Sequence, residues 1–141
     1  MNPRSCLVLL CVASLTAGCG GGKKGDQELL QGTWTVVSAE GKEGRGDDML
    51  NSRMTFFGSE VSVKKISEKG VNGTFQLEEG KDPKEIDLVL KNGATEVKIQ
   101  ALYSLEPDTL KLCFADPKQP RPTKLVATQD QGVMTLKRAK P

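Results

Sequence analysis

The sequence predicts an all-β fold, a small up-and-down antiparallel β-barrel preceded by one short helical turn. From residue 32 onward, apolar and polar residues alternate with a period of two in about eight or nine short segments, as in strands with one buried face. Turn-forming pairs separate these segments, among them Asn72-Gly73, Asn92-Gly93 and Gln131-Gly132. Many short antiparallel strands, each polar on one face, are typical of a barrel or a sandwich.

The predicted elements follow one another closely along the chain. A helical turn begins at Asp26, which can cap it, and ends at Gly32. The connection at residues 40–51 is the longest expected one, and it either covers the open end of the barrel or is a mobile surface loop. Leu125 and Ala127 continue the strand pattern before the last strand. The inward-facing side chains that we expect to line a ligand site are Val36, Met54, Phe56, Val61, Phe75, Leu88, Ile99, Tyr103, Leu112 and Phe114.

The N-terminal segment has the pattern of a lipoprotein signal peptide. Arg4 precedes an uncharged apolar run at residues 6–17, which is shorter than the roughly 20 residues that a transmembrane helix needs. Small residues come directly before Cys19, as in a bacterial lipobox, in which the cysteine thiol accepts a diacylglycerol; Thr16 replaces the usual leucine. The alternatives are an ordinary signal peptide with a fortuitous cysteine, or a buried N-terminal strand.

These features divide the chain into three parts. Residues 1–18 are the predicted signal peptide, residues 19–26 the lipidated cysteine with a glycine-rich tether, and residues 27–141 the barrel domain. We therefore expect an exported protein that a lipid anchors to a bacterial cell membrane. Gly20 follows the cysteine in place of aspartate, which favours the outer membrane or another periplasmic face.

Composition excludes several classes of function. The chain has 20 Lys and Arg against 18 Asp and Glu, interspersed, so it offers no basic stripe for nucleic acid. It has no histidine, which is the commonest general base and metal ligand. Cys113 is the one cysteine left after export and lipidation, and we expect it to face outward under a loop. We expect no metal, no cofactor and no enzyme activity; a hydrolase is kept as a third alternative.

Gly32-Thr33-Trp34 matches the G-x-W motif that opens the first strand of lipocalin-like (calycin-like) barrels. Arg138 is in phase with the apolar residues of the last strand and therefore faces the interior, as Trp34 does. In lipocalins, an arginine from the last strand packs over this tryptophan and closes the base of the barrel. The alternative is a core tryptophan and an unrelated terminal arginine.

The resemblance extends over about residues 29–138 to an uncharacterised lipocalin-like family of Planctomycetes. That family implies a barrel fold and a setting outside the cytoplasm, and it implies no established activity. Leu125 stands where an aromatic residue is expected. The segments that resemble the family are residues 30–34, 81–88, 103–115, 121–123 and 136–138.

The leading functional hypothesis is binding of a small apolar or amphipathic molecule in the barrel or at its mouth. An eight-stranded barrel has an interior that side chains can just fill, so a solid core is the alternative. A solid barrel would indicate a protein-interaction or scaffolding domain that works through its outer face. An apolar cavity of a few hundred Å³ with an open mouth would favour the ligand.

Overall fold

The structure, a computed structural model, describes residues 24–41 and 47–140. The predicted signal peptide and Cys19 lie outside the described residues. The chain forms one helical turn, α1 (Asp26–Leu30), and one 3-10 turn, η1 (Asp47–Met49). The strands are β1 (Gly32–Glu40), β2 (Arg53–Phe57), β3 (Glu60–Lys64), β4 (Val71–Glu78), β5 (Lys84–Asn92), β6 (Thr95–Leu105), β7 (Thr109–Ala115) and β8 (Gln131–Arg138).

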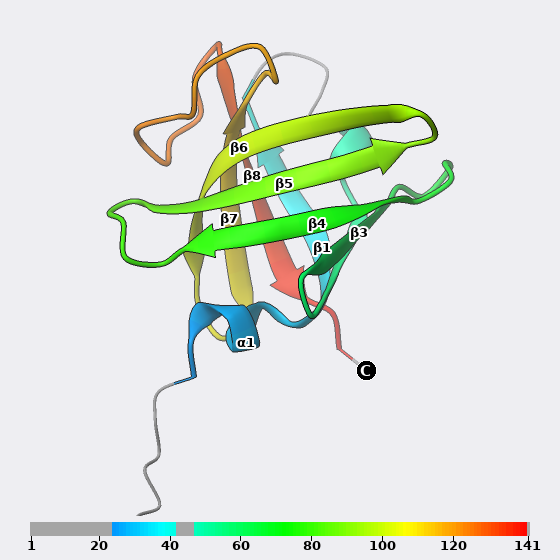
Figure 1. Ribbon diagram of the computed structural model, residues 1–141, viewed down its shortest axis with the longest axis horizontal. Coiled ribbons are helices and arrows are strands. Elements are labelled where there is room, and N and C mark those ends of the chain that lie inside the picture. Colours follow the sequence, from blue (N-terminus) through cyan, green and yellow to red (C-terminus); the bar gives the residue numbers. More distant parts are fainter. Residues whose placement is uncertain (1–23, 42–46, 141) are drawn as a thin grey trace, which may run out of the picture.

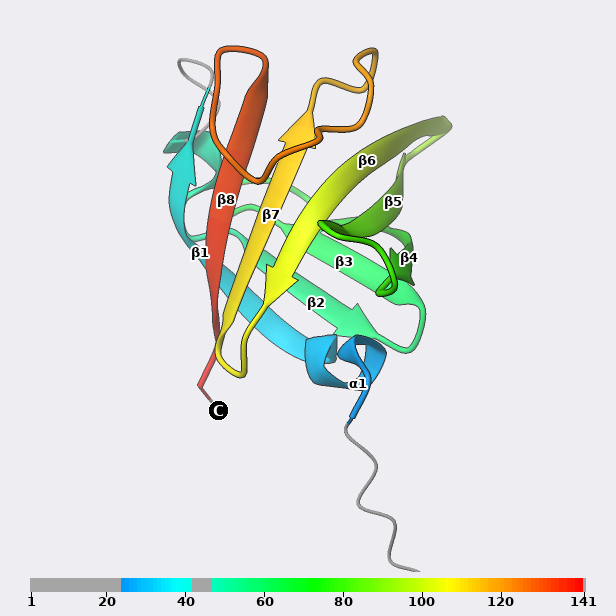
Figure 2. The ribbon, with the colours of Figure 1, turned by 90° about the vertical axis from the view of Figure 1, so that its left-hand side faces the viewer.

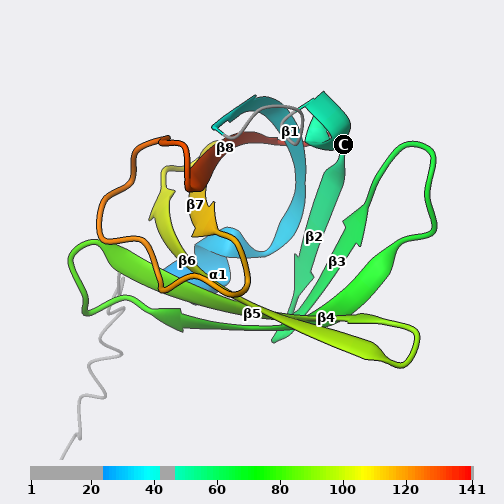
Figure 3. The same ribbon diagram turned by 90° about the horizontal axis from the view of Figure 1, so that it is seen from above.

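The eight strands form a closed up-and-down barrel, as the alternation predicted. Each strand pairs antiparallel with the next one along the chain, and β8 returns to pair with β1 (Figures 1 and 3). The register of this last pairing places Trp34 directly opposite Arg138. The pairing register with β8 shifts between Val36 and Ser38, where β1 has a β-bulge. The chain therefore has the architecture of a lipocalin-like barrel.

The two ends of the barrel differ (Figure 2). We call the end that α1 covers the closed end; β1 starts there, and β2, β6 and β8 finish there. The opposite end, where the β1–β2 and β7–β8 connections lie, is the open end. Large side chains with 2% exposure or less fill the closed end, namely Leu30, Trp34, Phe56, Tyr103, Leu110 and Leu136.

The N-terminal turn differs from the sequence prediction in its cap. Gly25 occupies the cap position, and no side chain caps α1. Asp26 is the first residue of the turn. Its carboxylate accepts hydrogen bonds from Lys84 and Tyr103 of the barrel and does not cap the backbone of α1. The prediction that Asp26 caps the turn is wrong for this reason. No helix among the described residues has the length and apolar character needed to span a bilayer.

The connection between β7 and β8 was also mispredicted. Residues 116–130 contain no strand, so Leu125 and Ala127 belong to this loop, which is longer than the connection after β1. Arg121 holds the loop against the outside of the barrel, since its guanidinium donates to the Ala101 carbonyl at 2.9 Å and to the Asp87 carboxylate. Period-two alternation alone cannot distinguish such a pinned loop from a strand.

Candidate ligand-binding cavity

The closed end is sealed by the cross-strand pair Trp34 and Arg138. The guanidinium carbon of Arg138 lies 4.2 Å from the centroid of the Trp34 ring, within the range of a cation–π contact. The indole N–H donates to the Leu30 carbonyl at 2.8 Å, so α1 and β1 are joined at the same point. Gly32 has a φ of +114°, and a Cβ there would lie 3.1 Å from Nη1 of Arg138. The glycine of the G-x-W motif therefore permits the positive φ of this turn and leaves room for the guanidinium of Arg138.

The carboxylate of Asp26 forms a second junction between α1 and the barrel. It accepts hydrogen bonds from Nζ of Lys84 at 2.6 Å and from the Tyr103 hydroxyl at 2.8 Å. Burial raises the pKa of Tyr103 well above its ordinary value of 10, and the hydrogen bond to Asp26 raises it further. Tyr103 is thus a neutral hydrogen-bond donor within the closed end.

Two glutamines attach α1 to the β2–β3 turn. The side-chain amide of Gln27 donates to the Gly58 carbonyl at 2.7 Å. Gln31 binds both backbone groups of Gly58. Its Nε2 donates to the Gly58 carbonyl at 3.0 Å, and its Oε1 accepts from the Gly58 amide at 2.7 Å. Together with the aspartate junction, these bonds hold the turn across the base of the barrel.

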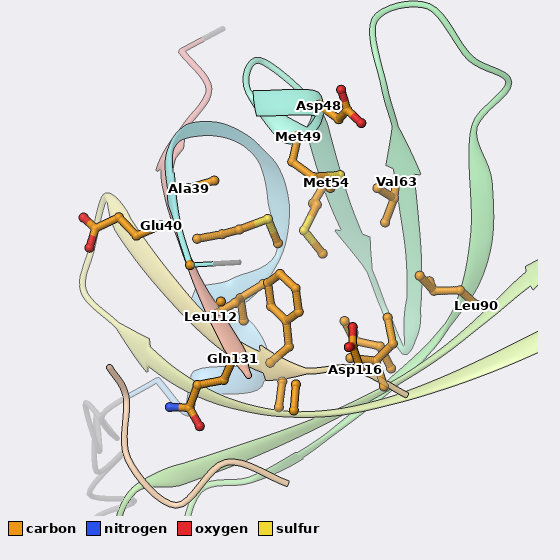
Figure 4. A pocket seen from close by; sticks show the side chains of 18 of the residues that line it. Ala39, Glu40, Asp48, Met49, Met54, Val63, Leu90, Leu112, Asp116 and Gln131 are labelled. Atoms are coloured by element: carbon orange, nitrogen blue, oxygen red, sulfur yellow. The ribbon is translucent and has the colours of Figure 1, made fainter. Parts of the chain in front are cut away.

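The open half of the barrel contains a cavity of about 520 Å³ (Figure 4). Side chains from all eight strands form its apolar wall, and Met49 of η1 reaches it from the β1–β2 connection. The apolar lining residues are Ala39, Met49, Met54, Val63, Val71, Leu88, Leu90, Ile99, Ala101, Leu112, Phe114, Ala115 and Met134.

The polar lining residues of the cavity come from strand ends and connections at the open end. Glu40 ends β1, Asp48 lies in η1, and Lys65 follows β3. Asp116 follows β7, and Asp130 precedes β8. An apolar interior below a charged rim is the chemistry that an amphipathic molecule requires, with its apolar part inside and its polar group toward water.

The structure divides the ten predicted lining residues between the two halves. Met54, Leu88, Ile99, Leu112 and Phe114 line the cavity. The others face inward but do not line the cavity, because they pack into the core below it. These five are Val36, Phe56, Val61, Phe75 and Tyr103.

Several lining residues were not named as candidates from the sequence. Leu90 and Val63 are in phase with lining or core residues on their own strands, so the alternation contained their signal. Met49 had no such signal, because it lies outside the strands. Alternation reports the face of a strand, whereas the height of a residue along the barrel axis depends on strand tilt and register.

Cys113 lies on the opposite face of β7 from Leu112 and Phe114, under the β7–β8 loop. It is fully buried, and its thiol lies 3.4 Å from the Lys124 carbonyl and 3.7 Å from the Val126 carbonyl. Burial raises the pKa of this thiol. A protonated, covered thiol outside the cavity has the role of a packing residue.

Comparisons with known proteins found no family model, no curated protein and no solved structure that matches this chain. Within residues 24–41 and 47–140, no group of three acidic or cysteine side chains is arranged to hold a metal ion.

Proposed function

We propose that this chain is an exported lipoprotein that binds a small apolar or amphipathic molecule in the open half of its barrel. The proposal includes anchoring through a diacylglycerol on Cys19 and kinship with the lipocalin-like family of Planctomycetes that the sequence resembles. The single observation that carries the binding function is the apolar cavity of about 520 Å³. This volume falls within the roughly 300–1,000 Å³ typical of small-molecule sites.

The packing of the two halves supports binding over a solid scaffold. A scaffold that works only through its outer face would be stabilised by side chains that fill the barrel along its whole length. Here bulky residues fill the closed end, while Ala39, Ala101 and Met134 leave space at the open end. Apolar surface left unburied in a folded domain costs stability, so its retention favours a function for the space.

A fluorescent apolar dye tests the binding site. Nile red should bind the purified barrel with increased emission, and Ala39→Phe should weaken this binding about tenfold by filling the rim side of the cavity. Val37→Phe is the matched control, because Val37 is on the same strand but 50% exposed on the outside. Equal dye binding by both variants and the parent chain would contradict the proposed site.

Extraction of the native protein identifies what the cavity holds. Organic extraction followed by mass spectrometry should recover a small apolar or amphipathic compound from the parent chain, in near-stoichiometric amount. The Ala39→Phe variant, purified in the same way, should yield much less of it. Recovery of the same compound at the same level from both would indicate surface contamination.

The anchor is tested separately from the cavity. Mass spectrometry of the native protein should show a diacylglycerol on Cys19, and Cys19→Ala should release the protein from membranes. An unmodified Cys19 in a protein found away from membranes would refute the lipoprotein proposal and leave the cavity proposal intact.

A further inference from the structure

The described chain starts at the closed end of the barrel, opposite the mouth of the cavity (Figure 2). The guanidinium of Arg138 donates to the backbone carbonyls of Leu29 and Gln31, the latter at 2.8 Å. The Asp26 and Gln27 contacts described above hold the same turn from its other side. The point at which the chain enters the barrel is therefore fixed by bonds to four separate elements, β2–β3, β5, β6 and β8.

The length of chain between the proposed anchor and this point is short. Cys19 and Gly25 are separated by six peptide units, which span at most about 20 Å even when fully extended. The closed end must then stay within about this distance of the lipid headgroups. The nine residues of β1 rise about 20 Å toward the mouth at the tilt usual for barrel strands. If the mouth faced the bilayer, the tether would have to run from the closed end along the barrel wall to the membrane. That path would take its full length of about 20 Å.

The closed end also carries exposed apolar side chains beside the chain entry point. Phe57 ends β2 and is 79% exposed, and the next residue, Gly58, is the one that Gln27 and Gln31 bind. Leu29 of α1 is 36% exposed on the same end. An aromatic ring held in the open at the end nearest a bilayer is placed to enter its interfacial region, where such rings partition favourably.

We propose that the closed end faces the anchoring membrane, with Phe57 in contact with the lipid interface, and that the cavity opens away from that membrane. This inference rests on the proposed anchor at Cys19. It implies that the cavity exchanges its ligand with the aqueous side, through a soluble or opposing donor, and that the ligand does not enter sideways from the bilayer that holds the protein.

Labelling the native lipidated chain at its two ends tests this orientation. The variants are Phe57→Cys at the closed end and Ile66→Cys at the β3–β4 connection, which follows the rim residue Lys65. Ile66 is 76% exposed, so the two sites match in exposure. In vesicles of phosphatidylethanolamine and phosphatidylglycerol, a headgroup-linked quencher should quench a fluorophore at residue 57 several-fold more strongly than one at residue 66.

A second pair of labelled variants tests the same orientation with Phe57 unchanged. Glu106→Cys lies at the closed end in the β6–β7 turn, and Asn92→Cys lies at the end of β5 beyond the lining residue Leu90. The label at residue 106 should be the more strongly quenched, and adding Phe57→Ser should reduce that quenching.

The outcomes separate the orientation from the anchor. A lipidated, vesicle-bound chain whose open-end labels are quenched as strongly as its closed-end labels overturns the orientation alone. A chain with unmodified Cys19 that stays off the vesicles overturns the anchor and, with it, the orientation. A lipidated chain with the predicted order of quenching that is unaffected by Phe57→Ser supports the orientation and overturns the contact by Phe57.

Discussion

The closed and open ends are built from the same strands but are filled differently. β1 supplies Trp34 to the closed end and Ala39 to the cavity, and β7 carries buried Leu110 near its start and ends beside the rim residue Asp116. At the closed end, large rings are joined to polar side chains that bridge α1 to the barrel. At the open end, smaller and flexible side chains border empty space. A packed core and an apolar cavity thus occupy opposite ends of one sheet.

The largest expected effect is from Trp34→Ala. It removes a fully buried ring and its contact with Arg138, so the free energy of unfolding should fall by about 3–5 kcal/mol in urea denaturation. Leu90→Ala, at the cavity wall, should cost only about 1 kcal/mol because the side chain already borders open space. Equal losses from both changes would remove the distinction between the two ends.

A smaller loss is expected from Asp26→Asn. The change removes the charge that binds Lys84 and Tyr103, and hydrogen bonds to charged groups contribute about 1.5–3 kcal/mol. Because Lys84 remains partly exposed, we expect a loss near the lower limit, about 1.5 kcal/mol. Glu28→Gln is the control, since this acidic residue of the same turn is exposed. Urea denaturation of the two variants gives the comparison, and a loss no larger than the control would show that the junction adds no stability.

The closed end should also make stability depend on high pH. Tyr103 has its pKa raised in the folded state, by burial first and by Asp26 second. Below pH 10 the phenol is protonated in both states and its contribution is complete. Above pH 10 only the unfolded state ionises, so stability should fall with a slope approaching about 1.4 kcal/mol per pH unit.

The chain has one tyrosine, so its ultraviolet absorbance reports this ionisation directly. Tyrosinate should form only as the protein unfolds, and Tyr103→Phe should remove this part of the alkaline slope. A tyrosinate signal from the folded protein near pH 10 would contradict the assignment.

The smallest expected effect has the opposite sign. Ser52, just before β2, is fully buried, and its hydroxyl has no hydrogen-bond partner in the described part of the chain. Its backbone amide and carbonyl bond to Met49 and Val36. Ser52→Ala should therefore raise the free energy of unfolding by about 1 kcal/mol, measured by the same urea titration. A clear loss of stability would indicate that the hydroxyl has a partner.

The sequence predicted the strands and the barrel because each strand has one solvent-facing and one buried face, which gives an alternation of polar and apolar residues. It also predicted that Trp34 and Arg138 face the same interior, and the structure places them in contact. It could not place residues along the barrel axis, so Tyr103 was grouped with Phe114 although one lies beside α1 and the other at the cavity. That grouping fails because height depends on pairing between strands, which no single segment encodes.

The other mispredictions have long-range causes as well. Asp26 would cap its turn if the turn stood alone, but Lys84 and Tyr103 compete for its carboxylate. Leu125 and Ala127 alternate as strand residues do, yet Arg121 binds Asp87 on β5 and holds residues 116–130 as a loop. In each case the local structure depends on a hydrogen bond to a side chain distant in sequence, which local periodicity cannot predict.

Closure of the barrel by β8 has a consequence for how the chain folds. Arg138 and Gln31 are joined although they are 107 residues apart, and β1 pairs with β8 along most of its length. Until the last strand has been synthesised, β1 and β7 each present an unpaired edge on which another chain can form strands. Folding must therefore wait for its most distant pairing, which makes it slow for a domain of this size. Any truncation within β8 leaves those edges open and should convert a closed barrel into an aggregating sheet.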